Sequence, residues 1–242
     1  MIAEKAGYRQ IVLELGGNSP LIVMEDADLD RAATLAVAGA TKNSGQRCTA
    51  VKRILVIDPI ANDSVRLVTV KAKKLKYGDP MNSQTDVGTV INEQSAILFQ
   101  HRVEDAVTAG AKLLHGNNRQ GVVFPPTVVD HVSWDCELVM QETFGPAIPI
   151  IRIQDVNEAI QVANGTIFGL SSRVCKNRLD YITRFIAELN HGAINIWEVP
   201  GYRSEMSPFG GVKGSGLGYK EGIIEVMKSY TNLKTFSISW IM

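Results

Sequence analysis

The sequence has few cysteines, few histidines and no excess charge of either sign. Its three cysteines, an odd number without a CxxC pair, fit neither a disulfide framework nor a zinc site. Its four histidines are scattered, and none lies in an HExxH-like spacing. Lys+Arg 25 balances Asp+Glu 25, which leaves no basic surface for nucleic acid. We therefore expect neither a metal site nor a nucleic-acid partner.

Long apolar runs are also missing. No apolar stretch approaches the roughly 18 residues that a membrane-spanning helix needs. The first ten residues, MIAEKAGYRQ, lack the apolar segment of a secretory signal. We therefore expect a cytoplasmic protein with no membrane partner. The 242 residues, 45% of them hydrophobic, are enough to bury a sizeable core in one large domain or two modest ones.

Strand-like and helix-like segments alternate along the chain. Helices are predicted from the N-cap Asp28 to about Ala40, from Pro59 to about Leu75, and over 92–111, 155–165 and 178–192. Strands are predicted at 10–15, 20–24, 53–58, 111–116, 122–130, 147–153, 170–175 and 193–197. This alternation predicts an α/β fold with a largely parallel sheet flanked by helices.

The C-terminal segment SYTNLKTFSISW (229–240) alternates like a further strand but has no obvious partner nearby. An unpaired strand of this kind is a candidate for pairing with another subunit. The alternative is an edge strand of the same sheet.

Cys48 stands in the segment KNSGQRCTA (42–50), between a helix-like and a strand-like run. A free thiol has a pKa near ~8.5, so a nucleophilic cysteine needs positive potential and access. Arg47 and Lys52 supply nearby cations, and Gly45 allows a tight turn. The alternative is an inert core residue, which is how most cysteines behave and how we interpret the other two in this chain.

Two carboxylates stand where a site could form. Glu14 ends the apolar run QIVLEL and is followed by two glycines, and Glu142 precedes a Phe-Gly-Pro turn. A carboxylate in an apolar strand is costly without a role or a partner, so each is either a functional acid or a structural ion pair. The glycine cluster PFGGVKGSGLG (208–218) lacks the spacing of a phosphate-binding loop, which favours a turn-rich structural loop.

Four segments occur in a familiar order: LELGGNSP (13–20), GQRCTA (45–50), ETFGP (142–146) and PFGGVKGSG (208–216). Together they resemble the C-terminal half of the NAD(P)-dependent aldehyde dehydrogenases, from about residue 8 to the end of the chain. The segments NIWEVPGYRSEMSPFGG and GQRCTAVKRIL look like the phosphonoacetaldehyde dehydrogenase branch of that family.

The resemblance implies roles for particular residues. Cys48 matches the catalytic thiol and Glu14 the general base. Glu142 matches the acid that binds the nicotinamide ribose, Phe144 the ring near the nicotinamide, and Gly16 a further cofactor-binding position. The implied reaction oxidises an aldehyde to a carboxylic acid through a thiohemiacetal and a thioester, with NAD or NADP as cofactor.

The resemblance also implies a domain organisation. Residues 1–15 would be the remnant of a cofactor-binding domain whose larger part is missing, 16–212 a catalytic domain, and 213–242 a C-terminal helix and oligomerisation strand. A homo-oligomer, a dimer or tetramer, is expected.

Two arginines suggest the substrate. Arg47 adjoins Cys48 and Arg203 precedes the PFGG segment, and two guanidinium groups suit a dianionic head such as that of phosphonoacetaldehyde. Alternatively, Arg47 bonds backbone carbonyls and Arg203 pairs with Glu205 or Glu198. Succinic semialdehyde is the competing substrate.

Two other classes of function remain open on the sequence. The half-chain could be catalytically inert and act only in oligomerisation or interaction. A thiol acyltransferase or hydrolase using Cys48 is the other class, although it would need a Cys–His pair and no histidine stands in a recognisable motif.

Overall fold

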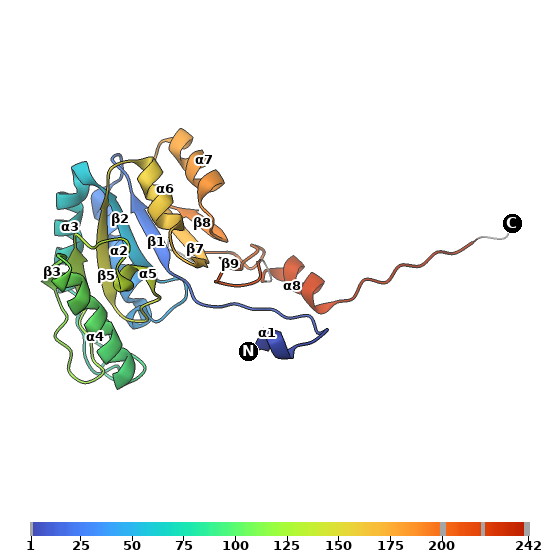
Figure 1. The fold of residues 1–242 in the computed structure, drawn as a ribbon, viewed down its shortest axis with the longest axis horizontal. Helices are drawn as coiled ribbons and strands as arrows, with labels where there is room; N and C mark the ends of the chain where they lie inside the picture. Colours follow the sequence, from blue (N-terminus) through green and yellow to red (C-terminus); the bar gives the residue numbers. More distant parts are fainter. Residues whose placement is uncertain (1, 199–201, 219–220, 240–242) are drawn as a thin grey trace.

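A seven-stranded sheet forms the centre of the computed structural model, which describes residues 2–198, 202–218 and 221–239. The strand order is β3-β4-β5-β2-β1-β7-β8 (Figure 1). The strands are β1 (Ser19–Val23), β2 (Val51–Ile57), β3 (Lys112–His115), β4 (Thr127–Asp130), β5 (Ala147–Ile153), β7 (Ser171–Cys175) and β8 (Ala193–Ile196). Among the described strands of this sheet, only the β3–β4 pair is antiparallel. The α/β fold with a largely parallel sheet is confirmed.

Helices cover both faces of this sheet. One face packs against α2 (Leu29–Thr41) and α3 (Asp58–Lys73). The other packs against α4 (Glu93–Thr108), α5 (Glu137–Met140), α6 (Val156–Asn164) and α7 (Leu179–Glu188). Leu21 and Ile22, neighbours in β1, are both fully buried and belong to opposite cores. Burial on both faces explains why the strands are continuously apolar rather than alternating.

The helices begin where the sequence places polar caps. Asp28 accepts a hydrogen bond of 3.1 Å from the backbone N–H of Arg31, as predicted for the start of α2. Asp155 likewise accepts from Asn157 and Glu158 at the start of α6. α3 begins at Asp58, directly after β2, with proline in its first turn.

The strand predicted at 10–15 is wrong. Residues 10–13 form no regular structure, and Glu14 makes only an isolated bridge to Gly216. A strand needs a neighbour to satisfy its backbone N–H and C=O groups, and residues 10–12 have none among the described parts of the chain.

The alternative of an edge strand in the same sheet is wrong for the described part of 229–240, whereas pairing with another subunit stays a prediction. The helix α8 (Ile223–Tyr230) extends into this range, and residues 231–239 have no regular structure, while residue 240 lies outside the described residues. This segment runs away from the sheet in Figure 1, as does the short helix α1 (Ile2–Lys5). Leu233 and Phe236 expose their side chains, so nothing described here pairs with the segment.

A short two-stranded sheet, β6 (Phe168–Gly169) with β9 (Val212–Lys213), lies beside the main sheet. β9 lies within the glycine-rich segment 208–218, whose other residues form turns, bends and isolated bridges, much as the sequence predicts. Within the described ranges, no helix is long and apolar enough to cross a membrane.

Candidate active site

Cys48 lies between the end of α2 and the start of β2, directly after the short 3-10 helix η1 (Lys42–Gly45). The turn before it is left-handed at three consecutive residues, with φ of 54° at Asn43, 52° at Ser44 and 72° at Gly45. A Cβ at Gly45 would lie 2.1 Å from the carbonyl oxygen of Gly145. Glycine is therefore required where the Cys48 segment crosses the Glu142 segment. Cys48 itself is half-buried.

The LELGG segment meets both of these segments. A Cβ at Gly17 would lie 2.2 Å from the carbonyl oxygen of Cys48. The backbone N–H of Gly17 donates a hydrogen bond of 2.8 Å to Oε1 of Glu142. Gly16 lies against the carboxylate of Glu142. The peptide after Glu14 therefore fixes the relative position of the thiol segment and the second carboxylate.

The glycine-rich segment holds Glu14 from the other side. Glu14 forms a backbone bridge with Gly216, and the N–H of Leu15 donates to the carbonyl oxygen of Ser215 over 3.0 Å. Ser215 is fully buried, and its Oγ accepts from the N–H of Gly169. All four sequence motifs, which span more than two hundred positions, therefore meet at one place.

The thiol of Cys48 has a raised pKa. Burial is the largest cause, and the carboxylates of Glu142 and Glu14 add to it, while the backbone N–H groups of Thr49 and Cys48 oppose it. Both carboxylates therefore act electrostatically on the sulfur. The cations that the sequence places nearby do not lower the pKa of this thiol below its usual range.

Glu14 also has a raised pKa, caused first by burial and then by the carboxylate of Glu221. The backbone N–H of Gly211 and the guanidinium of Arg203 oppose the shift. Its Oε1 is buried and accepts no hydrogen bond from the described residues. A carboxylate with a raised pKa and a free oxygen is well suited to take a proton from water.

Burial raises the pKa of Glu142 too, against the opposing effects of the Gly17 N–H and the Lys52 ammonium. Phe144, two residues on, is 41% exposed. It lines a cavity of about 580 Å³ together with residues of the turn that precedes Cys48 and of the 80–91 segment. Phe144 thus places an aromatic ring in a cavity that Gln46, two residues before Cys48, also lines.

The guanidinium of Arg47 is fixed by a hydrogen bond to the backbone. Its Nη2 donates to the carbonyl oxygen of Gly39 over 3.1 Å, which is the backbone bond that the sequence allowed as an alternative. Its Nε is buried with no partner among the described residues, and burial lowers its pKa.

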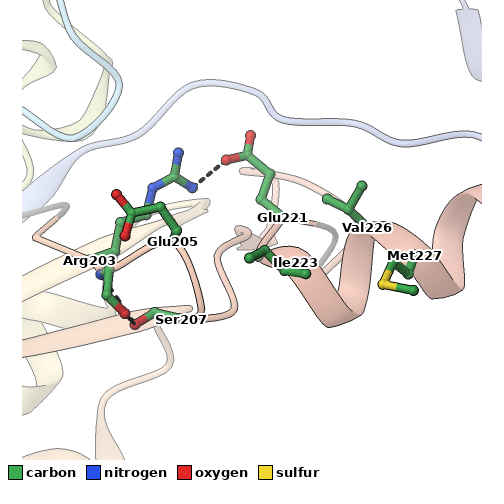
Figure 2. Close-up of a pocket in the computed structure, with 9 residues that line it drawn as sticks. Arg203, Glu205, Ser207, Glu221, Ile223, Val226 and Met227 are labelled. Carbon is green, nitrogen blue, oxygen red and sulfur yellow. Dashed lines mark hydrogen bonds and ion pairs between the residues drawn. The ribbon is translucent and has the colours of Figure 1, made fainter.

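Arg203 lines a second cavity, of about 640 Å³, between its own loop and α8 (Figure 2). The guanidinium forms an ion pair with Glu221 and stacks on the ring of Phe209 at 4.5 Å. The expected ion-pair partners were Glu205 or Glu198, so that expectation is wrong in its partner, because Glu221 at the start of α8 reaches the guanidinium across the cavity. Glu205 lines the same cavity.

Sequence reasoning missed two residues that hold the site together, Arg102 and Arg53, and it named Lys52 only as a cation near Cys48, without its contacts. Arg102 of α4 donates to the carbonyl oxygen of Glu142 and to Oγ1 of Thr143, each over 3.1 Å. Lys52 binds the same loop from β2. Arg53, fully buried, donates to the carbonyl oxygen of Asn18 over 2.8 Å. Only the charges within the apolar run VKRILVI gave a signal for Lys52 and Arg53.

The other cysteines and the histidines stand apart from this chemistry. Cys175 is buried in β7 with its pKa raised to about 12 by burial, and Cys136 caps α5. His191 is buried with its pKa lowered to about 3. No group of three metal-binding side chains occurs in the part of the chain that the structure describes.

The α/β fold that carries this thiol and these two carboxylates is similar to that of enzymes of known structure. The glyceraldehyde-3-phosphate dehydrogenase of Methanocaldococcus jannaschii, solved with NADP, superposes with a TM-score of 0.92 at 39% identity, over 96% of this chain and 50% of that one. The chain belongs to the aldehyde dehydrogenase family, whose model matches residues 1–236.

The curated relatives are also named as aldehyde dehydrogenases. The chain is 39% identical over 237 residues to the sulfoacetaldehyde dehydrogenase of Neptuniibacter caesariensis, covering 98% of this chain and 52% of the relative. It is 40% identical over 239 residues to the lactaldehyde dehydrogenase of Methanocaldococcus jannaschii, covering 99% and 51%. The chain therefore spans about half the length of the relatives it matches.

Proposed function

We propose that this chain supplies the catalytic half of an aldehyde dehydrogenase that oxidises a small aldehyde to a carboxylic acid. The observation that carries the proposal is the convergence at Gly17, three residues after Glu14: its backbone N–H donates to Oε1 of Glu142, and it packs against the carbonyl oxygen of Cys48. Family membership supports the reaction class.

The first step is attack of the Cys48 sulfur on the aldehyde carbon. The S–C bond forms, the carbonyl oxygen becomes an alkoxide, and the thiol proton leaves to solvent or to a nearby base. The backbone N–H of Cys48 is the donor proposed for that alkoxide, because a preorganised N–H stabilises charge as it develops.

A nicotinamide dinucleotide, when bound, supplies the acceptor for the hydride that converts the thiohemiacetal into a thioester. Some residues of the candidate site are suited to bind such a nicotinamide dinucleotide. Glu142 accepts from Gly17 with Oε1, its Oε2 packs against Gly16 and is the oxygen proposed for a ribose hydroxyl, and Phe144 lines a cavity with residues of the turn that precedes Cys48. None of these contacts distinguishes NAD from NADP.

Glu14 acts in the last step. Its carboxylate takes a proton from a water molecule, whose oxygen attacks the thioester carbon and releases the acid and the Cys48 sulfur. Its raised pKa strengthens it as a base, and its unpartnered Oε1 is available for the water.

We further propose a substrate with an anionic head, phosphonoacetaldehyde first and succinic semialdehyde second. Arg47 and Arg203 are the candidate ligands of that head, and two of the relatives named above are named for aldehydes with an anionic group. The ion pair of Arg203 with Glu221 must open or share the guanidinium for this binding.

A homo-oligomer is also proposed. Three exposed apolar side chains follow α8 in the segment 231–239, and burying them would favour association: Leu233, Phe236 and Ile238. Sedimentation of the chain over a concentration series tests this, and a monomer at every concentration would contradict it.

Two assays on the 242-residue chain test the main proposal. Hydrolysis of an activated ester needs only the thiol and the base, so turnover that depends on Cys48 supports the mechanism, and its absence contradicts it. A fluorescence titration with NAD and NADP tests the cofactor claim separately, and no binding would favour the inert alternative.

A further inference from the structure

Lys52 is a buried cation whose contacts the reaction as proposed does not use. It belongs to β2, four residues after Cys48, and is only 3% exposed. Its Nζ donates to the carbonyl oxygen of Gly45 and, over 2.8 Å, to the carbonyl oxygen of Thr143. One ammonium group therefore bonds the turn that precedes Cys48 and the loop that follows Glu142.

A third contact strengthens the second attachment. The Nζ of Lys52 lies 4.9 Å from the centroid of the Phe144 ring, in the geometry of a cation–π interaction. The charged groups that act on the ammonium are Glu142, which favours its charge most, Arg47, which opposes it, and Cys48, which favours it. The ammonium is therefore surrounded by the residues of the candidate site.

Burying this ammonium is costly. Desolvation lowers the pKa of Lys52 to about 7, which means that the charged form is disfavoured relative to a solvent-exposed lysine. An apolar side chain of the same length would fill the volume without this cost. It could not, however, bond two carbonyl groups on two different segments, because only an ammonium offers three diverging donors there.

We propose that Lys52 is a positioning residue that ties the Cys48 turn to the Glu142–Phe144 loop, so that the nucleophile and the cofactor-side residues keep one spacing. The roles of the two segments rest on the proposed function, whereas the tie itself rests on the contacts above. Without these contacts of Lys52, both the Cys48 turn and the Glu142–Phe144 loop should become more mobile.

Arg102 offers a contrast. From α4 it bonds the carbonyl oxygen of Glu142, the hydroxyl of Thr143 and the carboxylate of Glu137 in α5, and within the described residues it makes no hydrogen bond to the Cys48 turn. Its loss should loosen the 142–146 loop and the adjoining α5 but not the Cys48 turn. Lys176 offers a second contrast, because it is also fully buried yet pairs with Glu25 and Asp26 at the end of β7.

The test is hydrogen–deuterium exchange of the chain, read by mass spectrometry, for Lys52→Met, Arg102→Met and Lys176→Met. Each charged hydrogen bond lost should raise local exchange by about tenfold or more. We expect faster exchange in both 43–50 and 142–146 for Lys52→Met, in 142–146 but not 43–50 for Arg102→Met, and in neither for Lys176→Met. A Lys52→Met chain that folds and leaves either segment unchanged would overturn the proposal.

A second readout follows the nucleophile itself. The rate at which iodoacetamide alkylates Cys48, measured across pH, should change in Lys52→Met and keep its wild-type profile in Lys176→Met. An unchanged profile in Lys52→Met would overturn the proposal. Neither readout needs substrate or cofactor, so these outcomes are independent of whether the chain oxidises aldehydes.

A third measurement uses the wild-type chain and covers the case in which Lys52→Met does not fold. Nitrogen-15 NMR follows the titration of the Lys52 amine, and amide resonances report on Gly45 and Thr143. If Lys52 bonds both segments, the chemical shifts of both amides change with the same pH midpoint as the Lys52 amine. Amide resonances whose chemical shifts do not change as the Lys52 amine titrates would overturn the proposal.

Discussion

The carboxylate of Glu142 accepts a hydrogen bond of 2.8 Å from the backbone N–H of Gly17, which lies 125 positions earlier in the chain. The same glycine packs so closely on the carbonyl oxygen of Cys48 that no side chain fits between them. One peptide thereby sets the position of the proposed nucleophile and of the proposed cofactor ligand.

Cys48→Ser should abolish ester hydrolysis and aldehyde oxidation, because a serine hydroxyl is a far weaker nucleophile without a partner base. The loss should be at least about a thousandfold, while circular dichroism and melting temperature stay near wild type. Cys136→Ser, at the half-buried N-cap of α5, is the matched control and should keep full activity. Normal turnover in Cys48→Ser would refute the mechanism.

Arg203→Ala should raise KM for phosphonoacetaldehyde by about 10- to 100-fold, the worth of one or two charged hydrogen bonds, and leave KM for propionaldehyde nearly unchanged. Glu221→Gln removes the competing carboxylate of the ion pair and should lower KM for the anionic aldehyde. Steady-state kinetics in the active enzyme measure both. Equal effects on the two aldehydes would remove the anion-binding claim.

Gly45→Ala should prevent stable folding of the site or cost several kcal/mol, because its Cβ would lie 2.1 Å from the oxygen of Gly145. Gly121→Ala is the control, since it has a similar positive φ of 56° and nothing within 4 Å of the added Cβ. It should cost only about 1 kcal/mol of backbone strain. Urea unfolding of both variants makes the comparison, and equal losses would show that strain rather than the close approach matters at Gly45.

The pKa shifts of Glu14 and Glu142 predict how stability depends on pH. Burial raises both pKa values in the folded state, so the folded chain holds protons that the unfolded chain releases. These two groups therefore make the free energy of unfolding fall as pH rises from the usual value of 4.5 through the raised values.

Glu14→Gln should remove part of that slope and leave the protein more stable than wild type at neutral pH. Asp63→Asn, which alters a carboxylate that is 70% exposed on α3, should leave the slope nearly unchanged. Denaturant unfolding at a series of pH values provides the measurement. A Glu14→Gln protein that is less stable than wild type at pH 7 would be the opposite result.

Much of the fold was predictable because the strands are buried on both faces and the helices carry polar caps such as Asp28 and Asp155. The prediction of a strand at 10–15 was wrong because the apolar run resembles a buried strand. A strand forms only beside another strand, and residues 10–12 have no such neighbour among the described residues. The same physics explains 229–240, where alternation alone could not supply a partner and part of the run continues α8 instead.

The site was predictable where its residues stand in compact motifs, as Cys48, Glu14 and Glu142 do. Arg102 could not be predicted, because its contact with Thr143 joins α4 to a loop 41 positions away and leaves no local pattern. The partner of Arg203 was missed for the same reason, since Glu221 lies 18 positions beyond it across a cavity.

The central claim is that Cys48 forms an acyl intermediate and that Glu14 activates the water that removes it. Intact-mass spectrometry of the chain after brief exposure to 4-nitrophenyl acetate tests both parts at once. We predict an acetyl adduct on Cys48 that decays in wild type and persists at least about a hundredfold longer in Glu14→Gln. An adduct elsewhere, no adduct, or equally fast decay in the two proteins would contradict the account.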